Sequence, residues 1–229
     1  PYLSKISGLH MADVATRVMM GETLESMGYP DGLAREPEYV GVKVPVFSFE
    51  KVPNANSLLG PEMKSTGEVL GIGRTFEEAL YKGLTAGAFK FVSADGDKRM
   101  GVLLSVENRQ LGEIGELVSR LDADGRHIFA TPDTAAAVKA LGRYAFDIGA
   151  VTRTADIGGL LERANIGLVI YTGALHDDTM GDYVELHRQA VKRGIPTLTS
   201  IDTALAAVSL LDDGWTESST ELIDVSEIR

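Results

Sequence analysis

The sequence contains no cysteine among its 229 residues. Disulfide bonds, thiolate nucleophiles and zinc sites built on cysteine are therefore excluded. A cysteine-free composition fits a reducing compartment, and we expect a cytoplasmic location. No apolar run approaches the roughly 20 residues that a membrane-spanning helix needs, and no signal peptide is visible at the start. Because the chain begins with Pro1 rather than an initiator methionine, we expect a fragment of a longer protein.

Positive charge is also scarce, since 22 lysines and arginines face 33 aspartates and glutamates, for a net charge of −11. Proteins that bind nucleic acid normally present a basic surface, and anionic membranes attract basic segments. The composition therefore argues against both kinds of partner. Any site for an anion in this chain would be a local exception to the overall field.

A polar stretch at residues 93–99 separates two parts of different texture. Its composition is that of a linker, so we predict a first domain at 1–92, a linker at 93–100 and a second domain at 101–229. In the first domain, apolar spacing predicts a helix over residues 11–20 and alternation predicts a strand over 42–49. A further helix is expected after Thr75, which has capping-box spacing to Glu78. This part is predicted to be α+β.

The second part alternates between apolar runs and helix-like stretches. The runs cover residues 102–106, 127–130, 147–151, 168–171 and 196–198, and the helix-like stretches cover 111–121, 133–141, 157–164, 180–192 and 202–211. This alternation predicts an α/β domain with a parallel sheet that helices cover on both faces. Ligands of such sheets bind beyond the carboxyl ends of the strands. The acidic tail from Trp215 is expected to pack loosely or to add a last strand.

The turn between the second run and its helix is the best candidate for a binding site. Thr131 is placed to be the N-cap, Pro132 to be the first helical residue, and Thr134 stands in the first turn. Free backbone N–H groups, the helix dipole and two hydroxyls together would make a seat for phosphate or carboxylate. The alternative is that Thr131 only caps its own helix. The negative charge of Asp133 also argues against an anion there.

Other candidates are weaker. Thr172 follows a buried run, where an ordinary turn is the alternative interpretation. A His-Asp-Asp stretch at 176–178 has metal-ligand types, but a solvated loop is the favoured reading, and His187 is interpreted as a surface residue. Glycines at 67, 71 and 73 lack the dinucleotide spacing, and there is no P-loop, G-x-S-x-G or H-E-x-x-H motif. We therefore expect no catalytic residue and no metal site in this chain.

Three stretches, at residues 1–8, 58–69 and 73–79, resemble the carbamoyl-phosphate synthetase large chain. Residues 1–92 look like the end of its second ATP-grasp unit, and residues 101–229 like its methylglyoxal-synthase-like, Rossmann-like regulatory domain. The resemblance implies a parent ligase that makes carbamoyl phosphate for arginine and pyrimidine biosynthesis. Its substrates would be bicarbonate, ATP and ammonia from a glutaminase small chain. ATP and magnesium or manganese would bind upstream, so this fragment would be inactive alone, and the intact enzyme would be an oligomer.

The resemblance also implies an effector site, because the family's regulatory domain binds a nucleotide or related phosphate. Thr131 and Thr134 match the family's T-x-x-T phosphate turn, and Thr172 is what remains of an Asn-Thr-Thr motif. Arg109 would replace a lysine expected near residue 111, and a second expected lysine aligns with Ala150. Missing cations weaken a phosphate site, because charge-assisted contacts supply much of its energy.

These departures have further implications. Two acidic residues of the family's ornithine site align with Val44 and Ser200, so ornithine activation is not expected. Altered or absent uridylate control, as in an arginine-route isozyme, is the resulting hypothesis. Two alternatives stay open: a ligand-free docking module, and a free-standing methylglyoxal synthase. The second lacks support, since that enzyme needs a Gly-Gly-Asp segment that the sequence does not contain.

Overall fold

The computed structural model describes residues 2–29, 32–33, 36–46, 65, 67–89, 100–151, 154, 156–173, 180–212 and 214–228. The chain divides into two compact units. The first comprises residues 1–45, 68–87 and 215–229, and the second comprises residues 46–67 and 88–214. The predicted linker at 93–100 falls almost wholly outside the described residues, and the predicted domain limits stay a prediction. In the part that is described, no helix is both long enough and apolar enough to cross a membrane.

The first unit combines short helices with a two-stranded sheet. Its elements are α1 (Tyr2–Ser7), α2 (Met11–Met19), β1 (Val40–Val46), β2 (Gly67–Gly73) and α3 (Phe76–Ala86). The two strands pair with each other. The predicted helices at 11–20 and after Thr75 are confirmed. The predicted strand at 42–49 is confirmed as far as residue 46, and residues 47–49 lie outside the described part of the chain. The strand β2 was missed.

Glycines explain why β2 escaped prediction and why it can lie against α3. A Cβ atom at Gly71 would lie 1.9 Å from the carbonyl oxygen of Ala79 and 2.5 Å from the amide nitrogen of Gly83. Contacts that short never occur for a real Cβ, so only glycine allows this approach of strand and helix. The glycine spacing that looked like a defective nucleotide loop therefore serves backbone packing.

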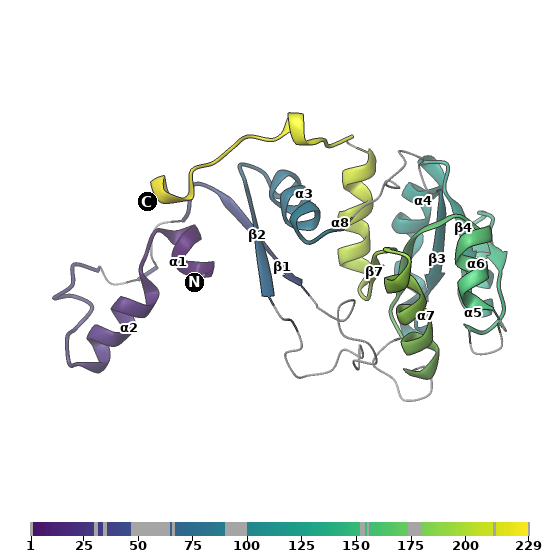
Figure 1. The fold of residues 1–229 in the computed structure, drawn as a ribbon, viewed down its shortest axis with the longest axis horizontal. Helices are drawn as coiled ribbons and strands as arrows, with labels where there is room; N and C mark the ends of the chain where they lie inside the picture. The colour runs from purple at the N-terminus through teal and green to yellow at the C-terminus, as the bar shows by residue number, and fades with distance from the viewer. Residues whose placement is uncertain are drawn as a thin grey trace. The chain divides into compact units, whose positions relative to one another are not determined.

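The end of the chain returns to the first unit. We call residues 215–228 the C-terminal arm. It contains two short 3-10 turns, Glu217–Ser219 and Val225–Glu227, joined by extended chain. Figure 1 shows the arm in yellow running past α3 towards α1. Of the two expectations for the tail, a last strand is wrong, because residues 214–228 contain no strand.

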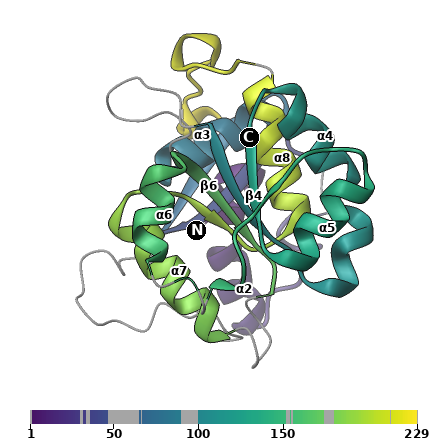
Figure 2. The same ribbon diagram turned by 90° about the vertical axis from the view of Figure 1, so that its right-hand side faces the viewer.

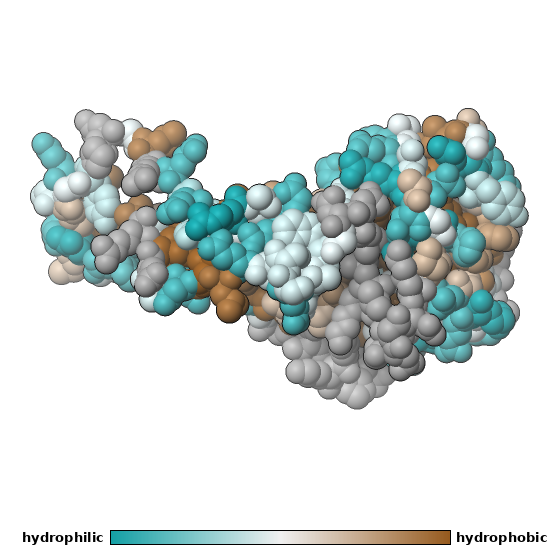
Figure 3. Space-filling view, turned by 90° about the horizontal axis from the view of Figure 1, so that it is seen from above, coloured by the Kyte–Doolittle hydropathy of each residue, from teal (hydrophilic) through white to brown (hydrophobic). Residues whose placement is uncertain are grey.

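Several large apolar side chains of the first unit are exposed. In Figure 3 they contribute brown groups beside teal hydrophilic residues. The helix α2 has no buried residue although its apolar residues share one face. The exposed apolar residues of the N-terminal region are Leu3, Met11, Val18, Met19, Met20, Leu24 and Leu33.

The second unit is a parallel α/β layer. Its strands are β3 (Gly101–Ser105), β4 (His127–Ala130), β5 (Phe146–Asp147), β6 (Ile166–Tyr171) and β7 (Thr197–Leu198). They form one sheet in the order β5-β4-β3-β6-β7, and each neighbouring pair is parallel. The predicted α/β class with a parallel, Rossmann-like sheet is confirmed.

Helices cover both faces of this sheet. They are α4 (Gly115–Ala123), α5 (Pro132–Ala140), α6 (Ile157–Arg163), α7 (Met180–Lys192) and α8 (Ile201–Asp212), and a 3-10 helix (Asn108–Glu113) precedes α4. Figure 2 shows α4, α5 and α8 on one side of the sheet, and α6 and α7 on the other. Every residue of β6 is buried, as expected for a strand covered on two faces. The core cluster centred on Leu103, Val169 and Leu186 fills one of these layers.

The strand order places a topological switch point in the middle of the sheet. From β3 the chain moves outward to β4 and β5 on one side, and it then crosses to β6 and β7 on the other. Open α/β sheets bind ligands at such a switch point, outside the carboxyl ends of the strands. The residues that follow β3, β4 and β6 are therefore the ones to examine.

Candidate functional site

Four hydroxyl-bearing residues meet at the carboxyl ends of the central strands. Ser105 ends β3 and pairs with Tyr171 at the end of β6, which places Thr172 beside it. Thr131 directly follows β4, and Thr134 lies one turn into α5. Parallel register therefore brings together three side chains that the sequence predicted and one, Ser105, that it missed.

Thr131 is at the centre of this group. It is the N-cap residue of α5 by position, yet its side chain makes no cap hydrogen bond. Its Oγ1 atom instead lies 3.2 Å from Ser105 Oγ and 3.2 Å from Thr134 Oγ1. The alternative interpretation, in which Thr131 only caps its own helix, is therefore wrong. Pro132 is the first helical residue, as predicted.

The other two threonines hold the loop that follows β3. Thr134 is fully buried, and its Oγ1 accepts a hydrogen bond of 3.0 Å from the backbone N–H of Val106. Thr172 is also buried, and its Oγ1 accepts a hydrogen bond of 2.9 Å from the N–H of Glu107. The two hydroxyls fix the backbone of this loop from opposite sides, since one comes from β4–α5 and the other from β6.

Arg109 lies on the same loop, in the 3-10 helix. Its side chain is 68% exposed, and its Nε atom donates a hydrogen bond of 2.8 Å to Oε2 of Glu107. An exposed ion pair of this kind is worth at most about 1 kcal/mol. The guanidinium is therefore readily redirected, but its charge is balanced locally by Glu107.

The electrostatics of the site come mainly from backbone groups. The N-terminus of an α-helix carries a partial positive charge and free N–H groups. α5 brings that end to the carboxyl edge of the sheet beside Thr131 and Ser105. Asp133, in the same first turn, is exposed to solvent, which weakens its repulsion of an anion. Chemically, this arrangement can bind and orient an anionic group.

Metal ligation has no support in the described part of the chain, where no group of three or more histidine, aspartate or glutamate side chains could hold an ion. The His-Asp-Asp stretch at 176–178 lies outside the described residues. His187, which the sequence predicted to be a surface residue, is half-buried. Its ring stacks on that of Tyr183 with centroids 5.3 Å apart, and burial lowers its pKa. His187 is a packing residue of α7.

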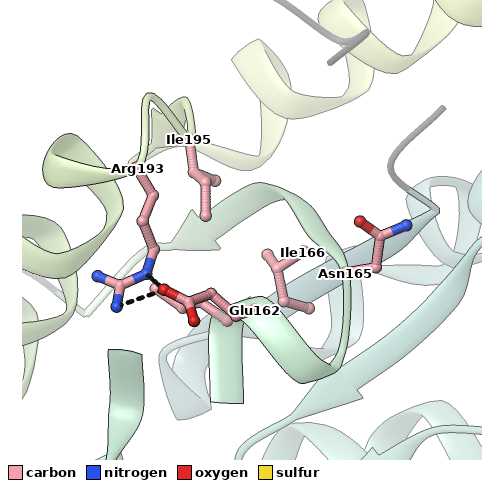
Figure 4. Close-up of a pocket in the computed structure, with 6 residues that line it drawn as sticks. Glu162, Asn165, Ile166, Arg193 and Ile195 are labelled. Carbon is pink, nitrogen blue, oxygen red and sulfur yellow. Dashed lines mark hydrogen bonds and ion pairs between the residues drawn. The ribbon is translucent and has the colours of Figure 1, made fainter. Parts of the chain in front are cut away.

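A pocket elsewhere in the second unit is a poorer candidate. Figure 4 shows that it is lined by residues before β6 and β7, among them Asn165 and Ile195. It therefore lies at the amino ends of the strands, away from the switch point. The cation that it offers is engaged, because Arg193 donates from Nε to Oε1 of Glu162 at 3.0 Å and from another nitrogen to Gln189.

The known proteins that resemble this chain in sequence carry the same name. The chain is 40% identical over 226 residues to the carbamoyl phosphate synthase large chain of Clostridium perfringens strain 13, an alignment that covers 98% of this chain and 21% of that protein. It is 35% identical over 227 residues to the protein of the same name from Clostridium botulinum strain Loch Maree, with 99% and 21% covered. The chain thus spans about a fifth of the length of the relatives it matches. No family model matches the chain.

Proposed function

Because the chain is related to a C-terminal part of the carbamoyl phosphate synthase large chain, we propose that its second unit is the regulatory domain of such a ligase. The parent enzyme would make carbamoyl phosphate from bicarbonate and glutamine-derived ammonia, for arginine or pyrimidine synthesis. ATP, its magnesium or manganese, and the glutaminase partner would bind parts of the protein outside this chain. The fragment itself would regulate the reaction and would not catalyse it.

The proposed effector is a phosphate-containing molecule bound at the carboxyl edge of the sheet. The observation that carries this assignment is the orientation of Thr131. Its hydroxyl is directed at Ser105 and Thr134, and its own helix end is left without a side-chain cap. A helix N-terminus without a cap, beside two converging hydroxyls at a switch point, is an arrangement suited to an anion.

Each residue of the proposed site has its own part. Thr131 and Ser105 would donate hydrogen bonds to the phosphate oxygens. Thr134 and Thr172 would act through the loop after β3, whose amides they hold. Arg109, which is exposed, would turn from Glu107 to the anion. With only one flexible cation in this set, affinity for nucleotides should be modest.

Regulation would follow from a shift between conformations. A ligand that binds one arrangement of the regulatory unit more tightly favours that arrangement in the whole enzyme. Coupling free energies of this kind are typically about 1–3 kcal/mol, which corresponds to a change in activity or affinity of roughly 5- to 150-fold.

The experiment is calorimetric titration of the chain with UMP, IMP, phosphoribosyl pyrophosphate and inorganic phosphate. Thr131→Val keeps the shape of the side chain and removes the hydroxyl. A hydrogen bond to a charged group is worth about 1.5–3 kcal/mol, so the dissociation constant should rise roughly 10- to 150-fold. Thr16→Val is the matched control, since Thr16 lies on α2, where its hydroxyl bonds only the carbonyl of Ala12. Binding that Thr131→Val leaves unchanged refutes the site, and tight UMP binding refutes the idea of reduced uridylate control.

A second candidate function is a ligand-free docking module. It is favoured by the fact that the hydroxyls of Thr134 and Thr172 already accept backbone N–H groups, so that both serve the fold. In that case none of the anions would release or absorb heat on titration. Within the complete synthase, Thr131→Val would then leave the response to effectors unchanged.

A further inference from the structure

The C-terminal arm is held by a small set of specific contacts. At their centre is Glu78 on α3, whose side chain is only 8% exposed. Its Oε1 atom accepts the backbone N–H of Glu221 at 2.8 Å and the ammonium of Lys82 at 2.8 Å. Its Oε2 atom accepts the N–H of Arg74 at 2.9 Å. The carboxylate thus joins α3, the end of β2 and the arm.

Glu221 is recognised at three separate groups. Its N–H binds Glu78, its carbonyl accepts a hydrogen bond from Lys82 Nζ, and its carboxylate accepts one of 2.8 Å from Arg74 Nε. Lys82 also donates to the carbonyl of Ile72 at 2.7 Å, which fixes the ammonium in place. Glu221 is thus bound through both its backbone and its side chain, which makes its docking site specific.

The arm has one aromatic anchor and little other apolar burial. Trp215, the only tryptophan of the sequence, stacks on Tyr81 of α3 with ring centroids 6.3 Å apart. Beyond Glu221 the burial is uneven: Leu222 is 98% and Val225 is 41% exposed, whereas Ile223 and Ile228 are half-buried and the turn Val225–Glu227 contacts α1. Segments with few buried apolar contacts open at low free-energy cost. Residues 215–221, which are held by the Trp215 stack and the Glu221 contacts, are therefore the part of the arm that we expect to open at low cost.

The arm is also the direct continuation of the sheet unit. α8 follows β7, so its N-terminus lies at the carboxyl edge of the sheet, and its far end leads through Gly214 into Trp215. α8 packs against α4, the helix that follows the loop held by Thr134 and Thr172. α8 has 12 residues and is about 18 Å long, and it ends at Asp212, three residues before the arm begins in the sequence.

We propose that residues 215–221 form a reversible clasp on the rest of the first unit, docked on Arg74, Tyr81 and Lys82, and that this clasp responds to the ligand state of the sheet edge. The docking site binds an acidic residue, Glu221, and an aromatic residue earlier in the same segment, Trp215. Its occupant is this chain's own C-terminal segment. The transmission half of the inference rests on the proposed effector site, whereas the docking half does not.

Docking is tested by acrylamide quenching of Trp215 fluorescence in the 229-residue chain. Glu221→Gln removes the carboxylate that Arg74 binds, and Lys82→Met removes the ammonium that binds both Glu78 and Glu221. Each variant should raise the quenching constant severalfold. Glu217→Gln, in the exposed part of the arm, is the control and should leave it unchanged. Equal quenching in all of these chains refutes the docking site. Since Glu221 is on the arm, its substitution does not endanger the fold of the first unit.

Transmission is tested by adding inorganic phosphate, or UMP, at a concentration that saturates the calorimetric signal. Binding should change the quenching constant of Trp215 at least twofold in the parent chain. In Glu221→Gln the anion should still bind saturably, with its affinity altered only by the lost coupling, but it should produce no such change. If the anion binds and Trp215 does not respond, transmission is refuted and the effector site stands. If no anion binds, the effector site and transmission both fall, and the docking half is decided by the quenching of the variants alone.

Discussion

Glu78→Gln is the substitution that tests the first unit most sharply. Glu78 is buried and accepts hydrogen bonds from the ammonium of Lys82 and from the N–H groups of Glu221 and Arg74. Glutamine has the same shape, but it is neutral, and one of its two terminal atoms donates where the carboxylate accepts. At least one backbone N–H would then face another donor, and the ammonium of Lys82 would lose its counter-charge.

The magnitude follows from the pKa of this carboxyl group. Burial alone would raise the pKa of Glu78, but the hydrogen bonds from Lys82, Glu221 and Arg74 outweigh burial and lower the pKa to about 2 from its ordinary value of 4.5. At roughly 1.36 kcal/mol for each pKa unit, this corresponds to about 3 kcal/mol of stabilisation. Because the folded-state pKa is depressed, the stabilisation is complete above about pH 4.5 and is lost as the pH falls towards 2.

The assay is urea unfolding of the parent chain, Glu78→Gln and Glu77→Gln, followed by circular dichroism and Trp215 fluorescence from pH 7 to pH 3. Glu77 is the matched control, because it lies in the same first turn of α3 and is more exposed. At pH 7, Glu78→Gln should lower the free energy of unfolding of the first unit by about 3 kcal/mol, and the deficit should shrink below pH 4.5. A deficit no larger than that of Glu77→Gln, or one independent of pH, would falsify the reasoning.

Three further predictions concern the second unit. Thr134→Val should destabilise it by about 1–3 kcal/mol in thermal unfolding, because the buried N–H of Val106 loses its acceptor. Thr131→Val should cost less, about 0.5–1 kcal/mol, because its half-buried hydroxyl leaves no backbone N–H without an acceptor, and equal costs would contradict the roles assigned to the two hydroxyls. Leu103→Ala, at a fully buried position of the central strand, should cost about 2–5 kcal/mol in urea unfolding, and a cost below 1 kcal/mol would show that the core is misplaced. Burial lowers the pKa of His187, so stability should fall as the pH drops below about 6.5, and His187→Phe should remove that part of the pH dependence; an unchanged profile would show that His187 is exposed.

The spacing of apolar residues predicted the strands and helices of the second unit well, because in that unit the pattern of each element depends mainly on its own burial. Strands covered on both faces must be apolar along their whole length, and the amphipathic helices between them repeat every 3.6 residues. The predicted run at 147–151 is the exception, since β5 comprises only Phe146 and Asp147. β5 is an edge strand of the described sheet and pairs with β4, so only the residues that reach β4 are fixed as strand.

The features that sequence reasoning missed depend on distant contacts. β2 was not predicted because its close contact with α3 requires glycine at position 71, and glycine has no side chain that would show the alternation of a strand. Ser105 could be identified only from the parallel register of the strands, which brings the hydroxyl of Thr131, 26 residues away in the sequence, to the hydroxyl of Ser105. The arm has no periodic pattern, and its docking rests on Glu221 meeting Lys82 across 139 residues of sequence. Such pairings are set by tertiary structure and leave no local signal.

The central claim is that an anion binds where β3, β4 and α5 meet. The most direct measurement is a titration of the isotope-labelled chain with inorganic phosphate, followed by amide NMR signals. The largest shifts should be those of Val106, Glu107, Asp133 and Thr134, and they should vanish in Thr131→Val. Shifts centred on the first unit or around Arg193, or no saturable shift at all, would contradict the account.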